Sequence, residues 1–441
     1  MSLMLLGILN AQALGGGISY WLTSIGDTDN EDGFSVALDS SNNSYSVGGT
    51  DSIGQGGDDI LLVKRDPEGA VQWQRILGGT NTDRANSVAI DSSDNVYALG
   101  ISNSEGATGF LLAKYNSSGT IEWQRLLGGS ASDVGKSVAI DGSDNIYVVG
   151  ITSSEGPGSS SLLLAKYNIS GTVQWQRVLG GSSSEDGSSI NFDSSGNVYV
   201  FGQTNSEGSG LNDFLLAKYN SSGTIQWQRV FGGVASEVGE SVAIDASDNI
   251  YVLGKTNLQA TFGDGFLLAK YNSSGTIQWQ RMLSSTDDDD PSSVALDSSG
   301  NVYVFGQTNS EGAGGDDFIV AKYDSSGTIQ WQRVLGSSGS EIGSSIAIDS
   351  KDTLYLFGFT AGTGEGGNDF LLAKLSNDGS LTGTYELDGV DFVYAASTLT
   401  ASTTTLTSSA STLTASTSTL TASTSTLTAA SASLTSHLVE I

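Results

Sequence analysis

The amino-acid sequence predicts an all-β fold, a seven-bladed β-propeller with four antiparallel strands in each blade. Seven tryptophans recur at a spacing of 52 residues, apart from one interval of 50 residues. Between successive tryptophans lie four short apolar runs that are separated by turn residues. Four strands per repeat at this period are typical of propeller blades, whereas solenoid repeats are commonly roughly 20 to 45 residues long. The tryptophans are Trp21, Trp73, Trp123, Trp175, Trp227, Trp279 and Trp331.

The fourth copy shows the four runs of one blade. They span residues 189–193, 197–202, 213–219 and 224–231, and we call them strands A, B, C and D. Tight connections containing glycine join A to B and C to D, so consecutive strands are expected to be antiparallel neighbours. The B–C connection is the longest one and the most variable among the copies. The runs are continuously apolar, which predicts burial on both faces of each blade.

The two ends of the repeat region complement each other. A strand containing Trp21 precedes the first A strand, whereas the corresponding strand after the last C strand decays into residues 380–385. We expect the N-terminal strand at Trp21 to complete the last blade, because closure removes the free edges of the ring. The chain is thereby divided into a docking arm of residues 1–17, a propeller of residues 18–387 and a C-terminal segment of residues 388–441.

Composition excludes several classes of partner. The chain has 18 lysines and arginines against 48 aspartates and glutamates, a formal charge of −30, so nucleic acid is not expected to bind. The apolar run at residues 3–9 is too short to span a membrane and lacks a preceding basic residue. Neither membrane insertion nor a cleaved signal peptide is therefore expected, and a frayed tail is the alternative to a docking arm. The chain contains no cysteine, which excludes disulfides and thiol chemistry.

Several copies resemble a known repeat. The runs Asp213-Phe-Leu-Leu-Ala-Lys218, Gly196-Asn-Val-Tyr199 and Gln226-Trp-Gln-Arg-Val230 are similar to the SBBP β-propeller repeat of bacteria and phages. The resemblance covers residues 18–387 and implies the propeller fold. It implies no single activity, because that family hosts none.

Thirteen of the 18 basic residues recur at two fixed positions of the repeat. A side chain that is present in blade after blade is expected to be structural, and we predict ion pairs with the aspartate that ends each A strand, such as Asp193. Separate active sites in each blade are the alternative. These basic residues are Lys64, Lys114, Lys166, Lys218, Lys270, Lys322, Lys374, Arg75, Arg125, Arg177, Arg229, Arg281 and Arg333.

A carboxylate lies four residues before the start of each A strand. If A is the innermost strand, these carboxylates could form a ring at one mouth of the channel and hold Ca²⁺, an ion that prefers several oxygen ligands. The alternative is that each one caps the turn between strands D and A. No other metal and no organic cofactor is expected. The candidates are Glu31, Asp83, Asp133, Glu185, Glu237, Asp289 and Glu341.

The repeats carry no recognisable catalytic constellation. The one histidine is His437, outside the propeller, so the blades hold no histidine base or metal ligand. Carboxylates suitable for sugar cleavage are abundant, but no pair is distinguished from the others. The tryptophans repeat in the D strands, where packing between blades is expected rather than stacking on sugars. The sequence therefore predicts that the chain is not an enzyme.

Residues 388–441 are dominated by serine, threonine, alanine and leucine, and six leucines recur every seven residues. On a helix this spacing aligns the leucines in one stripe, whereas on a continuous strand it would place successive leucines on opposite faces. Serine and threonine are mediocre helix formers, so partner helices would be needed. We predict a helical, oligomeric stalk, with a trimer favoured; a disordered or glycosylated linker and a β-structured fibre are the alternatives. The leucines are Leu399, Leu406, Leu413, Leu420, Leu427 and Leu434.

The first residues carry a second resemblance. Met1-Ser-Leu-Met-Leu-Leu-Gly-Ile-Leu-Asn-Ala-Gln12 is similar to the start of virion structural proteins from marine tailed phages that infect cyanobacteria. It implies a tail fibre or tail-associated adhesin, with other virion proteins as partners of the arm and the stalk. We expect the variable B–C loops to bind the target, which could be a host-surface glycan. An exported bacterial surface protein is the second hypothesis, and a polysaccharide-degrading enzyme is the third.

Overall fold

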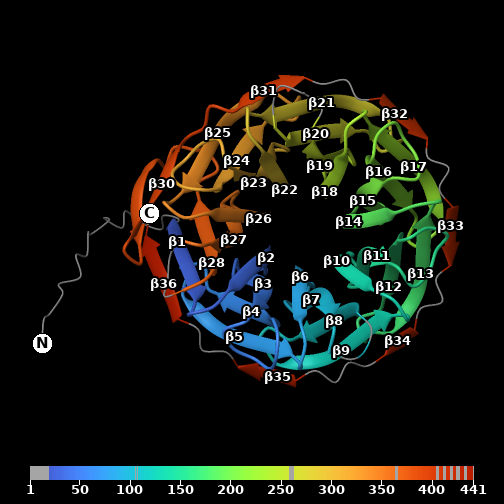
Figure 1. Cartoon of the computed structure of the whole chain (residues 1–441), viewed down its shortest axis with the longest axis horizontal. Helices are drawn as coiled ribbons and strands as arrows, with labels where there is room; N and C mark the ends of the chain where they lie inside the picture. Colours follow the sequence, from blue (N-terminus) through green and yellow to red (C-terminus); the bar gives the residue numbers. More distant parts are fainter. Residues whose placement is uncertain are drawn as a thin grey trace, which may run out of the picture.

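The computed structural model is a closed seven-bladed β-propeller (Figure 1). It describes residues 19–104, 106, 108–257, 263–362, 366–403, 407–410, 414–417, 421–423, 428–431 and 435–440. The predicted docking arm of residues 1–17 lies outside the described residues. Within these ranges, the chain forms no helix with the length and apolarity that crossing a lipid bilayer requires.

Each blade begins with an innermost strand, A, which faces the central channel (Figure 1). We number the blades 1 to 7 after their A strands in chain order. Neighbouring A strands contact one another all the way round the ring. The A strands are β2 (Glu31–Leu38), β6 (Asp83–Ile90), β10 (Asp133–Ile140), β14 (Glu185–Phe192), β18 (Glu237–Ile244), β22 (Asp289–Leu296) and β26 (Glu341–Ile348).

Strands B and C form the buried middle of each blade, as their continuous apolar runs predict. The B strands are β3 (Ser44–Thr50), β7 (Val96–Ser102), β11 (Ile146–Thr152), β15 (Val198–Thr204), β19 (Ile250–Thr256), β23 (Val302–Thr308) and β27 (Leu354–Thr360). The C strands are β4 (Asp59–Arg65), β8 (Gly109–Tyr115), β12 (Ser161–Tyr167), β16 (Asp213–Tyr219), β20 (Gly265–Tyr271), β24 (Asp317–Tyr323) and β28 (Asp369–Leu375).

The D strands confirm that the N-terminal part of the chain closes the ring. Strand β1 pairs with β28, so that Trp21 lies opposite Lys374 and Ile25 lies opposite Phe370. The last blade is therefore built from both ends of the repeat region, as predicted. The D strands of blades 1 to 7 are β5 (Val71–Gly78), β9 (Ile121–Gly128), β13 (Val173–Gly180), β17 (Ile225–Gly232), β21 (Ile277–Ser284), β25 (Ile329–Gly336) and β1 (Trp21–Gly26).

The hydrophobic core consists of clusters between neighbouring blades. One cluster joins Tyr147 and Leu162 of blade 3 to Val198, Leu215 and other buried residues of blade 4. Clusters of the same kind recur around the ring. Because each cluster takes side chains from two sheets, one blade cannot bury its apolar faces without its neighbours.

The repeated tryptophan and glycine fit each blade against the next one. The Trp73 indole donates a hydrogen bond to the carbonyl of Ser117, in the C–D turn of the following blade, at 3.3 Å. In the same turn Gly119 has a φ of +77°, and a Cβ atom at this position would lie 2.9 Å from the Trp73 ring. Only glycine combines that backbone conformation with so close an approach. The tryptophans therefore pack between blades, as predicted.

The repeated arginine of strand D binds the same turn. Arg75 Nε donates a hydrogen bond to the carbonyl of Gly119 at 2.6 Å, and its Nη2 donates to the carbonyl of Ser118 at 3.2 Å. The corresponding arginines of the next five blades bind the equivalent glycine carbonyls. Hydrogen bonds from a charged donor contribute about 1.5–3 kcal/mol each. The ion pair predicted between these arginines and the A-strand aspartates is therefore wrong, because the arginines bind backbone oxygens of the neighbouring blade.

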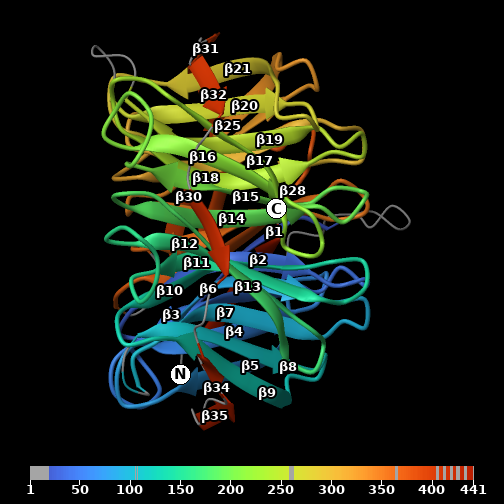
Figure 2. The same ribbon diagram turned by 90° about the vertical axis from the view of Figure 1, so that its right-hand side faces the viewer.

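Residues 388–441 do not form the predicted helical stalk where the structure describes them. Short strands run along the outer rim of the propeller, drawn in red in Figures 1 and 2. A hairpin of β29 (Gly383–Leu387) and β30 (Val390–Ala396) begins this path on blade 6. The following strands pair one after another with the D strands of blades 5, 4, 3, 2 and 1, and the last strand pairs with β1 of blade 7. These strands are β31 (Thr400–Thr403), β32 (Thr407–Ala410), β33 (Thr414–Thr417), β34 (Thr421–Ser423), β35 (Thr428–Ser431) and β36 (Thr435–Glu440).

We call β30 to β36 the belt, and its geometry explains the seven-residue period. One heptad of extended chain covers roughly 23 Å at about 3.3 Å per residue, and it carries the chain from one blade to the next. Successive belt strands from β31 to β36 begin seven residues apart, and each pairs with the D strand of a different blade. Threonine also favours strands over helices.

The structure describes one of the six leucines predicted to join subunits. Leu399 is buried, with 5% of its surface exposed, in the core cluster between blades 5 and 6. It packs within its own chain, and oligomerisation through the other leucines stays a prediction. Leu406, Leu413, Leu420, Leu427 and Leu434 lie outside the described residues.

Deletion of residues 400–441 should uncover the outer edges of the D strands. Backbone amides that pair with the belt would then face water, so hydrogen exchange in β9, β13 and β17 should accelerate at least tenfold, while exchange in the A strands stays unchanged. Hydrogen-exchange mass spectrometry of the full and shortened chains measures both. Unchanged exchange in the D strands, or a change from trimer to monomer on deletion, would contradict the belt.

Candidate functional site

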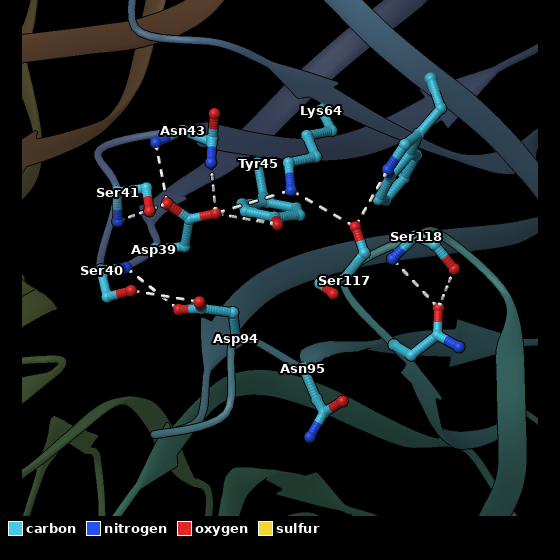
Figure 3. Close-up of polar contacts among 12 residues, drawn as sticks. Asp39, Ser40, Ser41, Asn43, Tyr45, Lys64, Asp94, Asn95, Ser117 and Ser118 are labelled. Carbon is cyan, nitrogen blue, oxygen red and sulfur yellow. Dashed lines mark hydrogen bonds and ion pairs between the residues drawn. The ribbon is translucent and has the colours of Figure 1, made fainter.

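The aspartate that ends each A strand organises a repeated polar cluster (Figure 3). Asp39 accepts hydrogen bonds from the backbone of Ser41 and Asn43 at 2.9 Å and from the Tyr45 hydroxyl at 3.1 Å. Lys64 Nζ lies 3.6 Å from the carboxylate and above the Tyr45 ring. Burial opposes ionisation of Asp39, but the hydrogen bonds from Asn43 and its neighbours lower the pKa of the carboxyl below its usual value.

The predicted lysine–aspartate ion pair is confirmed in five blades, where it ties strand C to the end of strand A. In the other two blades, Lys114 pairs with Glu122 at 3.0 Å and Lys374 donates a hydrogen bond to the carbonyl of Pro67 at 2.7 Å. The repeated lysines thus serve the frame of the propeller. The five pairs are Lys64–Asp39, Lys166–Asp141, Lys218–Asp193, Lys270–Asp245 and Lys322–Asp297.

The seven carboxylates considered for Ca²⁺ are fully buried in the turns between blades. Glu31 accepts a hydrogen bond from the backbone of Asp27 at 3.0 Å and from the Thr50 hydroxyl at 2.7 Å. Equivalent contacts are made by Asp133, Glu185 and Glu341. None of the seven lines the channel cavity, and the described residues contain no cluster of three acidic or histidine side chains placed to hold a metal ion. The contacts are those of turn caps, and Ca²⁺ binding stays a prediction.

A second buried acid accompanies this series in blade 6. Asp317, at the start of strand C, is 1% exposed. Burial, reinforced by the nearby charge of Glu341, raises the pKa of Asp317 to about 8. Burial and the charge of Asp83 raise the pKa of Asp59, in blade 1, to about 6. These positions hold a proton that an exposed aspartate would lose.

The channel wall is built around a β-bulge in each A strand. The register between β10 and β11 shifts between Gly135 and Ser137, which leaves Lys136 as the extra residue. The same shift occurs in the other six blades. A bulge re-aims a side chain, here towards the channel. We call the extra residues the bulge ring: Phe34, Asn86, Lys136, Ser188, Glu240, Ser292 and Ser344.

The bulge ring is one place within the A strands where the sevenfold symmetry of the sequence breaks. The position after the bulge is serine in every blade, whereas the bulge itself carries five residue types in seven blades. The frame demands a particular side chain at the tryptophan, arginine and serine positions but not at this one. Variation at a position that faces one shared space is therefore a mark of function.

All seven bulge residues line one cavity of about 440 Å³, together with Gln307, Ile342, Gly343 and Phe359. Glu31 lies opposite Thr50, the last residue of its B strand, so the D–A turns and the B–C loops share one face of the propeller. A bulge residue follows three positions after the start of its A strand. At about 3.3 Å per residue, the ring lies roughly 10 Å inside that face.

Lys136 and Glu240 bring opposite charges into the cavity. Lys136 is exposed to the channel and Glu240 is partly buried. Neither side chain takes part in a hydrogen bond or a close ion pair with another described group. Burial raises the pKa of Glu240 to about 7, with Lys136 opposing the shift and Asp290 adding to it. The cavity therefore offers both a hydrogen-bond donor and an acceptor that the frame does not use.

Blade-specific ion pairs surround the mouth of the channel. Arg84 contacts Asp58 and lies 3.6 Å from Asp32. Lys255 pairs with Asp264 at 2.6 Å and also contacts Asp290. Both basic groups are thus already neutralised by carboxylates. Lys136 is the basic side chain of the cavity that has no such close partner among the described groups.

Sequence reasoning placed binding in the B–C loops and missed the bulge ring. The A strand of the fourth copy begins at Glu185, four residues earlier than predicted, and the bulge lies in that unrecognised part. The sequence signal for the bulge ring is the variable residue that precedes a constant serine: it is aromatic, polar or charged, depending on the blade. An open polar hollow of about 540 Å³ lies between blades 1 and 2, where Gly57 and Thr108 of the B–C loops meet Thr80 and Asn81 of the D–A turn.

Comparisons with known proteins agree with the repeat and the fold. The SBBP β-propeller repeat matches residues 72–106, 122–157, 174–208 and 278–312. The regulatory protein FlaEY of Caulobacter vibrioides is 27% identical over 214 residues, which is 39% of this chain. The chain spans only 22% of that relative's length, and the likeness is thus confined to part of a larger protein.

Among solved structures, the polysaccharide lyase Uly1 superposes with a TM-score of 0.50 at 10% identity, over 83% of this chain and 94% of the lyase. An ulvan lyase reaches a TM-score of 0.48 at 10% identity, over 82% of this chain and 96% of its own. At this identity the likeness to Uly1 shows a shared fold. It nevertheless overturns the prediction that the chain is not an enzyme, because a propeller of the same fold carries out catalysis.

Stability should depend on pH through Asp317. The folded chain keeps a proton on this group up to about pH 8, whereas the unfolded chain loses it near pH 4, so stability falls as the pH rises between these values. In Asp317→Asn the amide stays neutral at every pH. The melting temperature of the parent should therefore fall relative to that of the variant from pH 4 to pH 8. A constant difference across this range in calorimetry would contradict a buried proton on Asp317.

The repeat and the fold establish what the chain is built from. Four copies match one repeat family, and the same strand pattern continues through all seven blades. The tryptophan, arginine and lysine contacts that define the repeat serve the frame, and the bulge ring stands apart from it. The chain is a seven-bladed β-propeller that carries SBBP β-propeller repeats.

Proposed function

We propose that the chain is a binding propeller on the surface of a virion appendage, and that it holds a host-surface glycan at the face bearing the B–C loops. The observation that carries the proposal is the broken symmetry of the bulge ring, which opens towards this face. Donor and acceptor side chains that the frame leaves free meet there in one cavity. Such polar groups in a concave site are what orient a ligand rich in hydroxyls.

Two exposed apolar side chains mark the same face. Leu211 lies in the B–C loop of blade 4 and is 75% exposed, and Val234, in the following D–A turn, is 88% exposed. The backbone of Leu211 donates a hydrogen bond to the carbonyl of Ala235 at 3.3 Å, so the two segments lie side by side. Large apolar groups left in water on a binding face are candidates for contact with a partner.

The double substitution Leu211→Ser/Val234→Ser should weaken binding of the labelled chain to host cells at least fivefold and leave its melting temperature within about 2 °C, since neither side chain is buried. Ile169→Ser is the matched control, because Ile169 is 44% exposed in a C–D turn on the opposite face. Flow cytometry with purified envelope polysaccharide as competitor reads out binding. Equal loss in the control, or no competition by the polysaccharide, would contradict the proposal.

The location on a virion rests on the resemblance of residues 1–12 to virion proteins, and an exported bacterial surface protein is the competing location. Antibody labelling of purified particles separates the two. Label at the tail or another appendage supports the virion, and particles without label support the bacterial surface.

Cleavage of a polysaccharide is a second candidate function, and Glu240 favours it. A carboxyl group with a pKa near 7 can act as a general acid or base at neutral pH, and Lys136 lies in the same cavity. Incubation with host envelope polysaccharide should then release shorter chains, and Glu240→Gln should abolish the release. Intact polysaccharide after prolonged incubation with the parent chain would exclude this candidate.

A further inference from the structure

The cavity has two unlike walls. Phe34 of blade 1 and Ile342 and Phe359 of blade 7 form a mainly apolar side, which also includes Ser344. The Arg84 guanidinium lies over the Phe34 ring, 5.3 Å from its centroid, and leaves the other face of the ring for a ligand. These two blades are neighbours, because β2 contacts β26 and β27. Lys136 of blade 3, Ser188 of blade 4 and Glu240 of blade 5 form a polar side. In a ring of seven, blade 4 stands opposite the boundary between blades 7 and 1, so the two walls face each other.

A sugar ring has the surface that such walls complement. One face of a pyranose exposes C–H groups that pack against aromatic rings, and its hydroxyls both donate and accept hydrogen bonds. The Lys136 ammonium is a donor only, and the Glu240 carboxylate is an acceptor only, when each is ionised. Two neighbouring hydroxyls can therefore satisfy both groups at once. The cavity, at about 440 Å³, lies within the range of about 300–1,000 Å³ found for small-molecule sites.

The position of the cavity restricts which part of a glycan can reach it. The seven A strands contact one another around the channel, so the cavity is walled on all sides and is approached along the propeller axis. The bulge ring lies about 10 Å inside the face. The middle of a polymer cannot be laid into such a space from the side, whereas the end of a chain can enter it.

Electrostatics select against an anionic sugar. The chain carries a formal charge of −30, and the carboxylates of Asp186 and Glu240 lie near enough to interact with Lys136, which has no close ion pair among the described groups. A uronate or a sulfated unit would bring a further negative charge to this site. A neutral unit meets no such repulsion.

We propose that the channel binds one neutral sugar unit at the end of a glycan chain, with its apolar face on Phe34 and Phe359 and two hydroxyls between Lys136 and Glu240. This inference rests on the proposed function that a glycan is held at this face, and it adds the chemical class of the unit and the restriction to a chain end.

The substitutions that test the inference introduce, at a bulge position, the serine that other blades carry there. Ser188, Ser292 and Ser344 show that serine is accepted at the bulge position, so Phe34→Ser, Lys136→Ser and Glu240→Ser should all fold. Lys351→Ser and Glu68→Ser are the matched controls, because both side chains are exposed in turns on the opposite face. Circular dichroism and the melting temperature confirm folding in each case.

Binding is measured by saturation-transfer NMR and calorimetry with glucose, galactose, mannose, fucose, rhamnose and N-acetylglucosamine, and with glucuronate as the anionic probe. We expect at least one neutral sugar to bind, glucuronate to bind at least tenfold more weakly, and each bulge variant to lose at least tenfold in affinity while the controls match the parent. Oligosaccharides of two to six units that end in the same sugar should bind within about twofold of one another.

Affinity that rises steadily with oligosaccharide length, a preference for glucuronate, or bulge variants that bind like the parent would overturn the inference. If those variants still bind host cells, the glycan is held by the loops and the proposed function stands alone. If a monosaccharide binds in the channel but host cells are not bound, the inference stands and the proposed function fails. If no saccharide and no host cell is bound, both fail.

Discussion

The packing of each blade against its neighbours is the constraint on which the whole molecule depends. A four-stranded sheet that is apolar on both faces cannot be stable alone, because each core cluster takes side chains from two blades. The ring must therefore close, and β1 closes it by supplying the missing strand of blade 7. In blades 1 to 6 the D-strand arginine reinforces the joint by binding the C–D turn of the next blade. At the joint between blades 7 and 1 the Trp21 indole donates a hydrogen bond to the carbonyl of Pro67.

A closed frame of this kind accepts different side chains at the bulge positions. The turn, core and joint positions are kept in blade after blade, because each is fixed by the same contact. The bulge points its residue into the channel, where Asn86, Ser292 and Ser344 each donate a hydrogen bond to a backbone carbonyl of the next blade, whereas Lys136 and Glu240 make no such contact among the described groups. Serine, asparagine, phenylalanine, lysine and glutamate are all accommodated there. The propeller can thus acquire a ligand site by substitution at these positions without a change in the frame.

Most of the fold could be predicted from the sequence, because the same pattern of strand and turn residues recurs in every copy of the repeat. The strand pattern, the number of blades and closure through Trp21 all follow from periodicity. The bulge could not be placed, because one extra residue in an A strand leaves the period unchanged and shows only in the register of pairing. The belt was mistaken for a helical stalk, because a spacing of seven fits both a helix stripe and a step from blade to blade.

Of the candidate site, the sequence supplied the face and the residues of the frame. The B–C loops were predicted to bind the target, and they lie on the face towards which the channel cavity opens. Lys136 and Glu240 are 104 residues apart and line the same cavity only through the curvature of the ring. The carboxylate series was recognised as a ring of possible ligands, whereas burial turns each member into a cap of its own turn. Neither the shared cavity nor the burial of the carboxylates can be predicted from local sequence, because both depend on how neighbouring blades approach each other.

The division between a constant frame and a variable channel is tested most directly by making the channel uniform. Phe34, Asn86, Lys136 and Glu240 can be replaced together by serine, the residue that the other three blades already carry. The account predicts a chain whose melting temperature stays within about 5 °C of the parent's and whose binding to host cells falls at least tenfold. A chain that unfolds, or one that binds host cells as the parent does, would contradict it.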